Sequence, residues 1–161
     1  IFPEPLIDKL PAGVAIWDTA TTTPPESKFL TKNQDQYISV YEEKSKWIKP
    51  RDLQLDIPAR TLTCRNLAGA TSDMHRIRLP DGRRRRLLIQ EAKRLQSFPD
   101  WFEFAGNETS QFNQIGNAVP PLMSFHIAES VANYLNNPFR YNEAEILQIN
   151  SSRKILLWQS Q

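Results

Sequence analysis

The chain has 161 residues and a formal net charge of only +2, so its overall charge does not indicate a nucleic-acid partner. Hydrophobic residues make up 40% of it and charged residues 24%, which is the balance of a folded soluble protein and excludes a disordered one. The single cysteine, Cys64, excludes an internal disulfide and a metal site of several cysteines, and it suits a cytoplasmic location. No apolar run reaches the length of a membrane span, and the N-terminal sequence is not that of a signal peptide. Because the chain begins with Ile1 and not with Met, we expect a processed or truncated piece.

The first part of the chain is rich in proline, with short apolar stretches between turn-forming residues. Its clearest strand signal is QYISVYEE, residues 36–43. In this strand Ile38 and Val40 would lie on one face, and Tyr37, Ser39 and Tyr41 on the other. Residues 58–88 also favour β structure, because RTLTCRN (residues 60–66) is rich in β-forming residues. We therefore expect an irregular, β-rich first part.

A hairpin is predicted for MHRIRLPDGRRRRLL, residues 74–88, whose PDG sequence supplies the turn. Its alternation predicts that Ile77 and Leu79 face one side of the hairpin and that Arg76 and Arg78 face the other.

The period changes to that of a helix from Ile89 onward. IQEAKRLQSF, residues 89–98, predicts a helix that Pro99 ends. A second helix is predicted for residues 120–135, with an apolar stripe formed by Leu122, Phe125, Ala128, Ala132 and Leu135. An isolated chain would expose this stripe, which predicts a partner surface or self-association. The aromatic side chains of FPDWFEF, residues 98–104, are interpreted as core packing in preference to base stacking.

The sequence QIGNAVPP, residues 114–121, is an unusual entry to that second helix. Two prolines are tolerated only in the first turn of a helix, where their missing N–H groups have no partner anyway. Gly116 permits a conformation or a close approach that other residues resist, and Asn117 offers both a donor and an acceptor. A plain helix-entry turn and a ligand-binding turn both fit this pattern.

Two stretches together resemble the last two conserved motifs of the DNA cytosine-5 methyltransferases. The matching residues are Arg85, Leu87, Glu91, Arg94, Leu95, Gln96, Phe98, Pro99 and Asp100 in the first stretch, and Gln114, Gly116, Asn117, Ala118, Val119, Pro120 and Pro121 in the second. Upstream, FPEP (residues 2–5) and PARTLT (residues 58–63) resemble parts of the family's target-recognition region, so that the resemblance covers roughly residues 1–137. The chain departs from the first motif at Leu88, Gln90 and Lys93, and Leu88 removes a threonine N-cap at a cost of about 1 kcal/mol.

The resemblance implies a mixed α/β fold in three parts. Residues 1–88 would form a β-rich, irregular target-recognition domain that binds double-stranded DNA. Residues 89–136 would form helices that close onto a Rossmann-like, S-adenosylmethionine-dependent catalytic domain, and residues 137–161 would be an extension without an assigned role.

The family's reaction centre is not found in this sequence. The family attacks a flipped cytosine with the cysteine of a Pro-Cys-Gln motif, uses the glutamate of Glu-Asn-Val, and binds most of the cofactor at a glycine-rich loop. Cys64 follows a threonine and has no evident activating base, so it is interpreted as buried or inert. We assign no catalytic residue and no metal ligand here, and we expect the chain alone to be inactive.

The resemblance assigns Asn117 and Ala118 to the rim of the S-adenosylmethionine pocket. Thr61 matches a position that contacts a DNA phosphate. Between residues 76 and 86 there are six arginines and one aspartate, which predicts either a solvated face or a DNA-binding surface. The predicted DNA-binding residues are Thr61, Arg65, Asn66, Arg76, Arg78 and Arg85. If about four phosphates are neutralised, the log–log salt slope of binding is expected near about −3.6.

Three functions remain open from the sequence. The first is the C-terminal part of a DNA cytosine-5 methyltransferase whose catalytic motifs lie elsewhere in a longer chain. The second is a natural small subunit of a split methyltransferase, with the Pro-Cys motif on a separate protein. The third is a DNA-binding module without enzymatic partner, which would bind DNA without any effect of S-adenosylmethionine.

Overall fold

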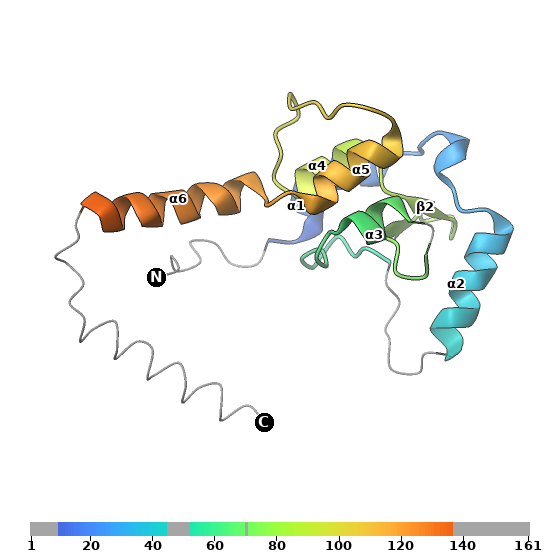
Figure 1. Ribbon diagram of the computed structural model, residues 1–161. Helices are drawn as coiled ribbons and strands as arrows, with labels where there is room; N and C mark the ends of the chain where they lie inside the picture. The colour runs from blue at the N-terminus through green and yellow to red at the C-terminus, as the bar shows by residue number, and fades with distance from the viewer. Residues whose placement is uncertain (1–9, 45–51, 70, 137–161) are drawn as a thin grey trace. The chain divides into compact units, whose positions relative to one another are not determined.

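The computed structural model describes residues 10–44, 52–69 and 71–136 (Figure 1). The predictions made for residues 2–5 and 137–161 lie outside these residues. The described chain is a mixture of helix and strand. Its elements in order are α1 (Ala12–Ala20), the 3-10 helix η1 (Glu26–Lys28), α2 (Lys32–Lys44), α3 (Cys64–Ala68), β1 (Arg76–Arg78), β2 (Arg84–Arg86), α4 (Ile89–Leu95), α5 (Glu108–Asn117) and α6 (Pro121–Asn136). Among the residues described, none of the helices combines the length and the apolar character that a membrane crossing requires.

The expectation of a β-rich first part is wrong for the described residues. The predicted strand at residues 36–43 is part of helix α2, and the β-rich signal at residues 60–66 runs into helix α3. Helix α3 begins where it does because Thr63 and Asn66 form a capping box: Thr63 N–H donates to Asn66 Oδ1 at 2.8 Å, and Asn66 N–H donates to Thr63 Oγ1 at 3.4 Å.

The predicted hairpin is confirmed. Strands β1 and β2 pair antiparallel, with Ile77 opposite Arg85. Gly82 takes a φ of +86° in the turn, a conformation that glycine adopts without strain. Ile77 is buried and Arg78 is exposed, as the alternation predicts, whereas Arg76 is fully buried and not exposed.

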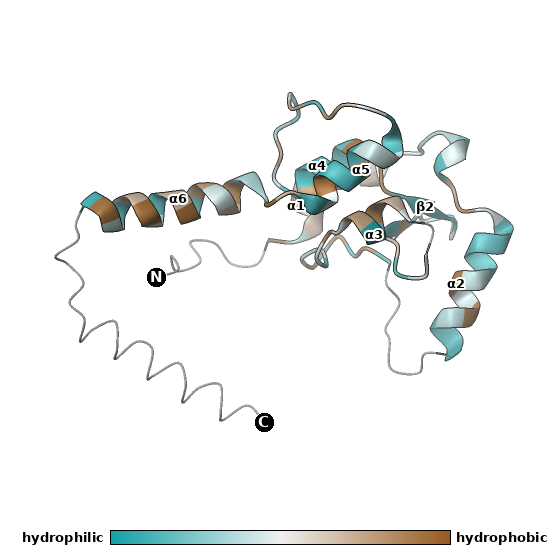
Figure 2. Cartoon of the chain, viewed as in Figure 1, coloured by the Kyte–Doolittle hydropathy of each residue, from teal (hydrophilic) through white to brown (hydrophobic). Residues whose placement is uncertain are grey.

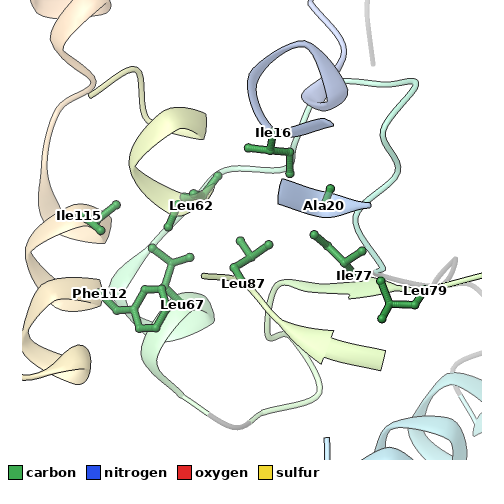
Figure 3. Close-up of a cluster of buried hydrophobic side chains, with 10 residues drawn as sticks. Ile16, Ala20, Leu62, Leu67, Ile77, Leu79, Leu87, Phe112 and Ile115 are labelled. Carbon is green, nitrogen blue, oxygen red and sulfur yellow. The ribbon is translucent and has the colours of Figure 1, made fainter. Parts of the chain in front are cut away.

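The apolar core joins helices α1 and α5, which lie far apart in the sequence, to the hairpin. It contains Ile16, Ala20, Leu62, Leu67, Ile77, Leu79, Leu87, Ala92, Phe112 and Ile115, which Figure 3 shows gathered between the elements. One core therefore spans both sides of residue 88, where the recognition domain is predicted to end. The division into three parts stays a prediction.

Helices α4 and α6 are confirmed, whereas α1 and α5 are additional. Helix α4 ends at Leu95, a few residues before Pro99, because Ser97 adopts a left-handed conformation with a φ of 62°. The prediction of core packing is correct for Phe104, which packs against the core, and Phe98 packs on Phe102 and Phe104 with ring centroids 5.2 and 5.0 Å apart. It is wrong for Phe102 and Trp101, which are 36% and 79% exposed.

The chain divides into two compact units, and the break falls inside α6, after Met123. The predicted apolar stripe on α6 is confirmed as exposed, because none of the helix's residues is buried. Figure 2 shows hydrophobic residues recurring along this helix.

Candidate functional site

The QIGN sequence forms the end of helix α5 and lies against the start of α3. A Cβ atom placed on Gly116 would lie 2.2 Å from the backbone N of Cys64 and 2.4 Å from the carbonyl carbon of Thr63. These distances are far below van der Waals contact, and the obstructing atoms are backbone atoms. Gly116 is therefore required by a close approach of two chain segments, one of the two reasons that the sequence suggested.

Two residues that follow helix α4 hold together this junction, the place where the end of α5 meets the start of α3 and continues toward α6. The buried side chain of Gln96 donates from Nε2 to the carbonyl oxygen of Ile115 at 3.1 Å, which gives a second donor to a carbonyl in the last turn of α5 that also accepts the N–H of Ala118 at 3.3 Å. Ser97 Oγ accepts the N–H of Leu122 at 3.1 Å, in the first turn of α6, next to the two prolines that have no N–H to donate. The end of α4 therefore fixes both the end of α5 and the beginning of α6.

The predicted cofactor residues follow directly on Gly116. Asn117 is the last residue of α5, and its exposed side chain makes no hydrogen bond with the described residues. Ala118 is extended, and its N–H donates to the Gln114 carbonyl at 3.1 Å. The arrangement leaves one side-chain amide, with its donor and its acceptor, free to bind a ligand beside a small residue.

Thr61, the predicted phosphate contact, is exposed, and its backbone is held from two sides. Its carbonyl oxygen accepts from Asn66 Nδ2 at 3.0 Å and lies 3.3 Å from His75 Nε2. Burial of His75 lowers its pKa to about 4, helped by the positive charges of Arg60 and Arg76. The imidazole is therefore neutral at physiological pH, with Nε2–H as the donor to Thr61. Asn66, which was predicted to reach DNA bases, is instead buried and used in these backbone contacts.

The arginine run is divided between buried ion pairs and exposed groups. Arg76 is fully buried and pairs with Glu42 and Asp52, while Arg84 pairs with Glu42 at 3.1 Å. Arg85 is also fully buried and binds Glu91 in a bidentate pair of 2.7 and 2.9 Å. Arg76, Arg84 and Arg85 therefore belong neither to a solvated face nor to a DNA-binding surface, because carboxylates neutralise their charges inside the protein.

Two of the predicted DNA-binding arginines remain accessible. Arg78 is 46% exposed and makes one contact with Asp52, at 2.9 Å. Arg65 is exposed on helix α3, on the segment that follows Thr61. The structure thus leaves Thr61, Arg65 and Arg78 able to contact a polyanion, and it gives structural roles to Asn66, Arg76 and Arg85.

A cleft of about 750 Å³ opens beside the junction. Thr61, Pro120 and Leu122 are among the residues that line it, and most of its other lining residues are apolar, with Val14 of α1 and Leu95 of α4 among them. The predicted DNA contact and the entry to α6 therefore border one cavity.

Comparison with known proteins shows which family has this arrangement of motifs. Residues 15–133 match the family described as C-5 cytosine-specific DNA methylase. The chain belongs to this family. It is 68% identical over 126 residues to the Type II methyltransferase M.AplI of Arthrospira platensis, a match that covers 78% of this chain and 36% of that protein. It is 39% identical over 83 residues to M.AgeI of Thalassovita gelatinovora, covering 52% of this chain and 18% of that protein. With M.Eco47II of Escherichia coli it shares 36% identity over 105 residues, covering 64% of this chain and 24% of that protein.

The chain spans about a third of M.AplI and less of the other two methyltransferases. No solved structure matches the chain.

Within this methylase segment, sequence reasoning missed the partners of the arginines. Asp35, Ser39 and Glu42 lie on one face of α2 and bind Arg84 or Arg76. These three residues are spaced four and three apart, as on one face of a helix. The spacing of polar residues could therefore have predicted helix α2, which the apolar pattern did not. A second missed residue is Asp18, which together with Asp100 binds the motif residue Arg94 at 2.8 and 2.7 Å. Hydrogen bonds from Arg94 lower the pKa of both carboxyl groups and raise that of the guanidinium above its usual range.

Proposed function

We propose that this chain is the DNA-recognising C-terminal portion of a DNA cytosine-5 methyltransferase, which methylates carbon 5 of cytosine in a specific duplex sequence. The observation that carries the proposal is the junction at Gly116, which brings the segment of Thr61 and the segment of Asn117 into backbone contact. In such an enzyme, DNA and the methyl donor must both be bound before transfer. A chain built only to bind DNA has no need for a cofactor-binding turn at this place.

The proposed DNA contacts are Thr61, Arg65 and Arg78. A threonine hydroxyl donates to one phosphate oxygen, and its position is fixed because Asn66 and His75 hold the carbonyl of the same residue. Guanidinium groups bind phosphate or the edge of guanine. The side chain of Arg78 is partly exposed and pairs with Asp52. Because exposed ion pairs are weak, Arg78 can exchange this aspartate for a phosphate at little cost in free energy.

S-adenosylmethionine, when bound, supplies the methyl group, and most of its site is proposed to lie outside this chain. Asn117 and Ala118 fit a place on its rim. The amide of Asn117 is exposed and offers both hydrogen-bonding functions, and the small side chain of Ala118 allows close approach. These residues bind and orient; no described residue is assigned to the chemical step.

The exposed helix α6 is proposed to pack onto the catalytic portion. Glu129 is the single acidic or basic residue among Asp, Glu, Lys and Arg in helix α6. Large apolar side chains such as Phe125 and Leu135 are 58% and 67% exposed. A surface of this composition is costly to leave in water and is typical of a buried interface. The catalytic portion would also carry the Pro-Cys motif, so that this chain alone does not methylate DNA.

Complementation tests the proposal. A methyltransferase such as M.AplI would be truncated to remove the region that matches this chain, and the truncated protein would be mixed with this chain and duplex DNA. Transfer of radioactive methyl groups from S-adenosylmethionine is expected from the mixture and from neither part alone. The matched control is this chain with Phe125→Glu, which should not restore transfer because it places a charge in the proposed interface.

Other outcomes would separate the alternatives. Methyl transfer by this chain alone would contradict the missing reaction centre. Salt-sensitive DNA binding without any restored transfer would favour a DNA-binding module. Restored transfer fits both a portion of a longer enzyme and a natural small subunit, and the size of the native product in cells, seen by immunoblot, distinguishes these two.

A further inference from the structure

We infer that Gly116 is a positioning residue that couples cofactor binding to DNA binding, so that each ligand strengthens the binding of the other. This inference rests on the proposed function, since it assumes the roles given to Asn117 and Thr61. It goes further by assigning the coupling to one backbone contact between helices α5 and α3.

The contact leaves no room for independent movement. Backbone atoms of Thr63 and Cys64 lie 2.2 to 2.6 Å from the place that a Cβ atom on Gly116 would occupy. A flexible side chain between two segments could absorb a shift of one of them, but packed backbone transmits it. The cofactor residue Asn117 is bonded directly to Gly116, and Thr61 is only two residues before Thr63.

Both sides of the contact are themselves fixed. On the DNA side, the capping box of Thr63 and Asn66 sets the start of α3, and Asn66 Nδ2 also holds the Thr61 carbonyl at 3.0 Å. On the cofactor side, Gln96 holds the Ile115 carbonyl at 3.1 Å. A ligand that orders either segment therefore restricts the other, and the second ligand meets a site that is already arranged. By thermodynamic linkage the effect is equal in both directions.

The test measures linkage in the complete methyltransferase that carries this segment. The dissociation constant of S-adenosylhomocysteine, an unreactive product, is measured by calorimetry with and without a short duplex. The duplex contains the target site, mapped beforehand by bisulfite sequencing of DNA that the enzyme has modified. In the unsubstituted enzyme the duplex is expected to tighten binding by about fivefold or more. The ratio of the dissociation constant without the duplex to that with the duplex measures the coupling. Gly116→Ala is expected to bring this ratio close to unity, because its Cβ atom separates the two segments.

A matched glycine provides the control. Gly82 lies in the hairpin turn with nothing within 4 Å of the place that a Cβ atom would occupy, at a positive φ that penalises alanine. Gly82→Ala therefore introduces backbone strain without touching the junction, and it should keep the full ratio. Loss of the ratio in both variants would overturn the inference, because it would then follow from general destabilisation.

A second pair of variants covers the case in which Gly116→Ala does not fold. Thr63→Ala removes the capping hydroxyl and loosens the start of α3 without a steric clash, so the ratio should fall. Thr63→Ser keeps the hydroxyl and should restore it. Equal ratios for these two variants and the unsubstituted enzyme, or no tightening by the duplex in the unsubstituted enzyme, would overturn the coupling. If DNA or S-adenosylhomocysteine does not bind at all, the proposed function itself has failed.

Discussion

Glu91→Gln removes the negative charge that neutralises Arg85 while it keeps the shape of the side chain. Both residues are fully buried, and two hydrogen bonds of 2.7 and 2.9 Å join them. The glutamine can still accept the N–H of Leu88, which Glu91 accepts at 2.7 Å, so the capping of α4 is kept. The change therefore tests the charge of the pair and not its shape.

The expected cost follows from leaving one buried charge without its partner. Breaking a buried ion pair from one side costs about 3 to 5 kcal/mol. The lower end, about 3 kcal/mol, is expected because the amide oxygen still accepts one guanidinium N–H, and Arg85 also donates to the carbonyl oxygens of Thr19 and Arg86. Since a domain of this size is stable by about 5 to 15 kcal/mol, the loss is a large part of the total.

Urea unfolding of the chain, followed by far-UV circular dichroism, measures this loss. Glu26→Gln is the matched control, because the Glu26 side chain is 87% exposed and its substitution should leave the midpoint unchanged. The double variant Arg85→Met with Glu91→Leu should recover much of the stability, since it removes both charges together. A loss below about 1 kcal/mol for Glu91→Gln would refute the reasoning, because a loss that small is typical of an ion pair exposed to water and not of a buried one.

Three other predictions concern pH, DNA and the partner surface. Below pH 6.5 the unfolded chain protonates His75, which the folded chain protonates only near pH 4, so stability should fall by up to about 3 kcal/mol as pH drops through this window. His75→Gln should flatten that slope in urea midpoints measured across the window, with His126→Gln, a change at a partly exposed side chain, as its control. Arg78→Ala should make the log–log salt slope of DNA binding shallower by about 0.9, measured by fluorescence anisotropy, and an unchanged slope would exclude a phosphate contact. Phe125→Ser should leave the unfolding midpoint unchanged, because the side chain is 58% exposed, yet it should weaken complementation of methyl transfer.

The sequence determined what depends on neighbours along the chain. The turn at Gly82, the hairpin around it and the two periodic helices α4 and α6 follow from local chemistry, and the structure has all of them. The motif spacing was also sufficient to identify the family, which the match over residues 15–133 confirms. These signals are visible without any knowledge of tertiary contacts.

Tertiary structure decided the roles of the charged residues. Arg76 and Arg78 look alike in the sequence, yet one is buried against Glu42 and Asp52 while the other is 46% exposed. The carboxylates that make this difference lie 34 and 24 residues away from Arg76, on segments whose approach no local pattern encodes. The same holds for Gly116: the sequence allowed either a special conformation or a close approach, and only the packing of α5 on α3 selected the second. Burial and long-range pairing are properties of the assembled fold, because they depend on which distant segments meet.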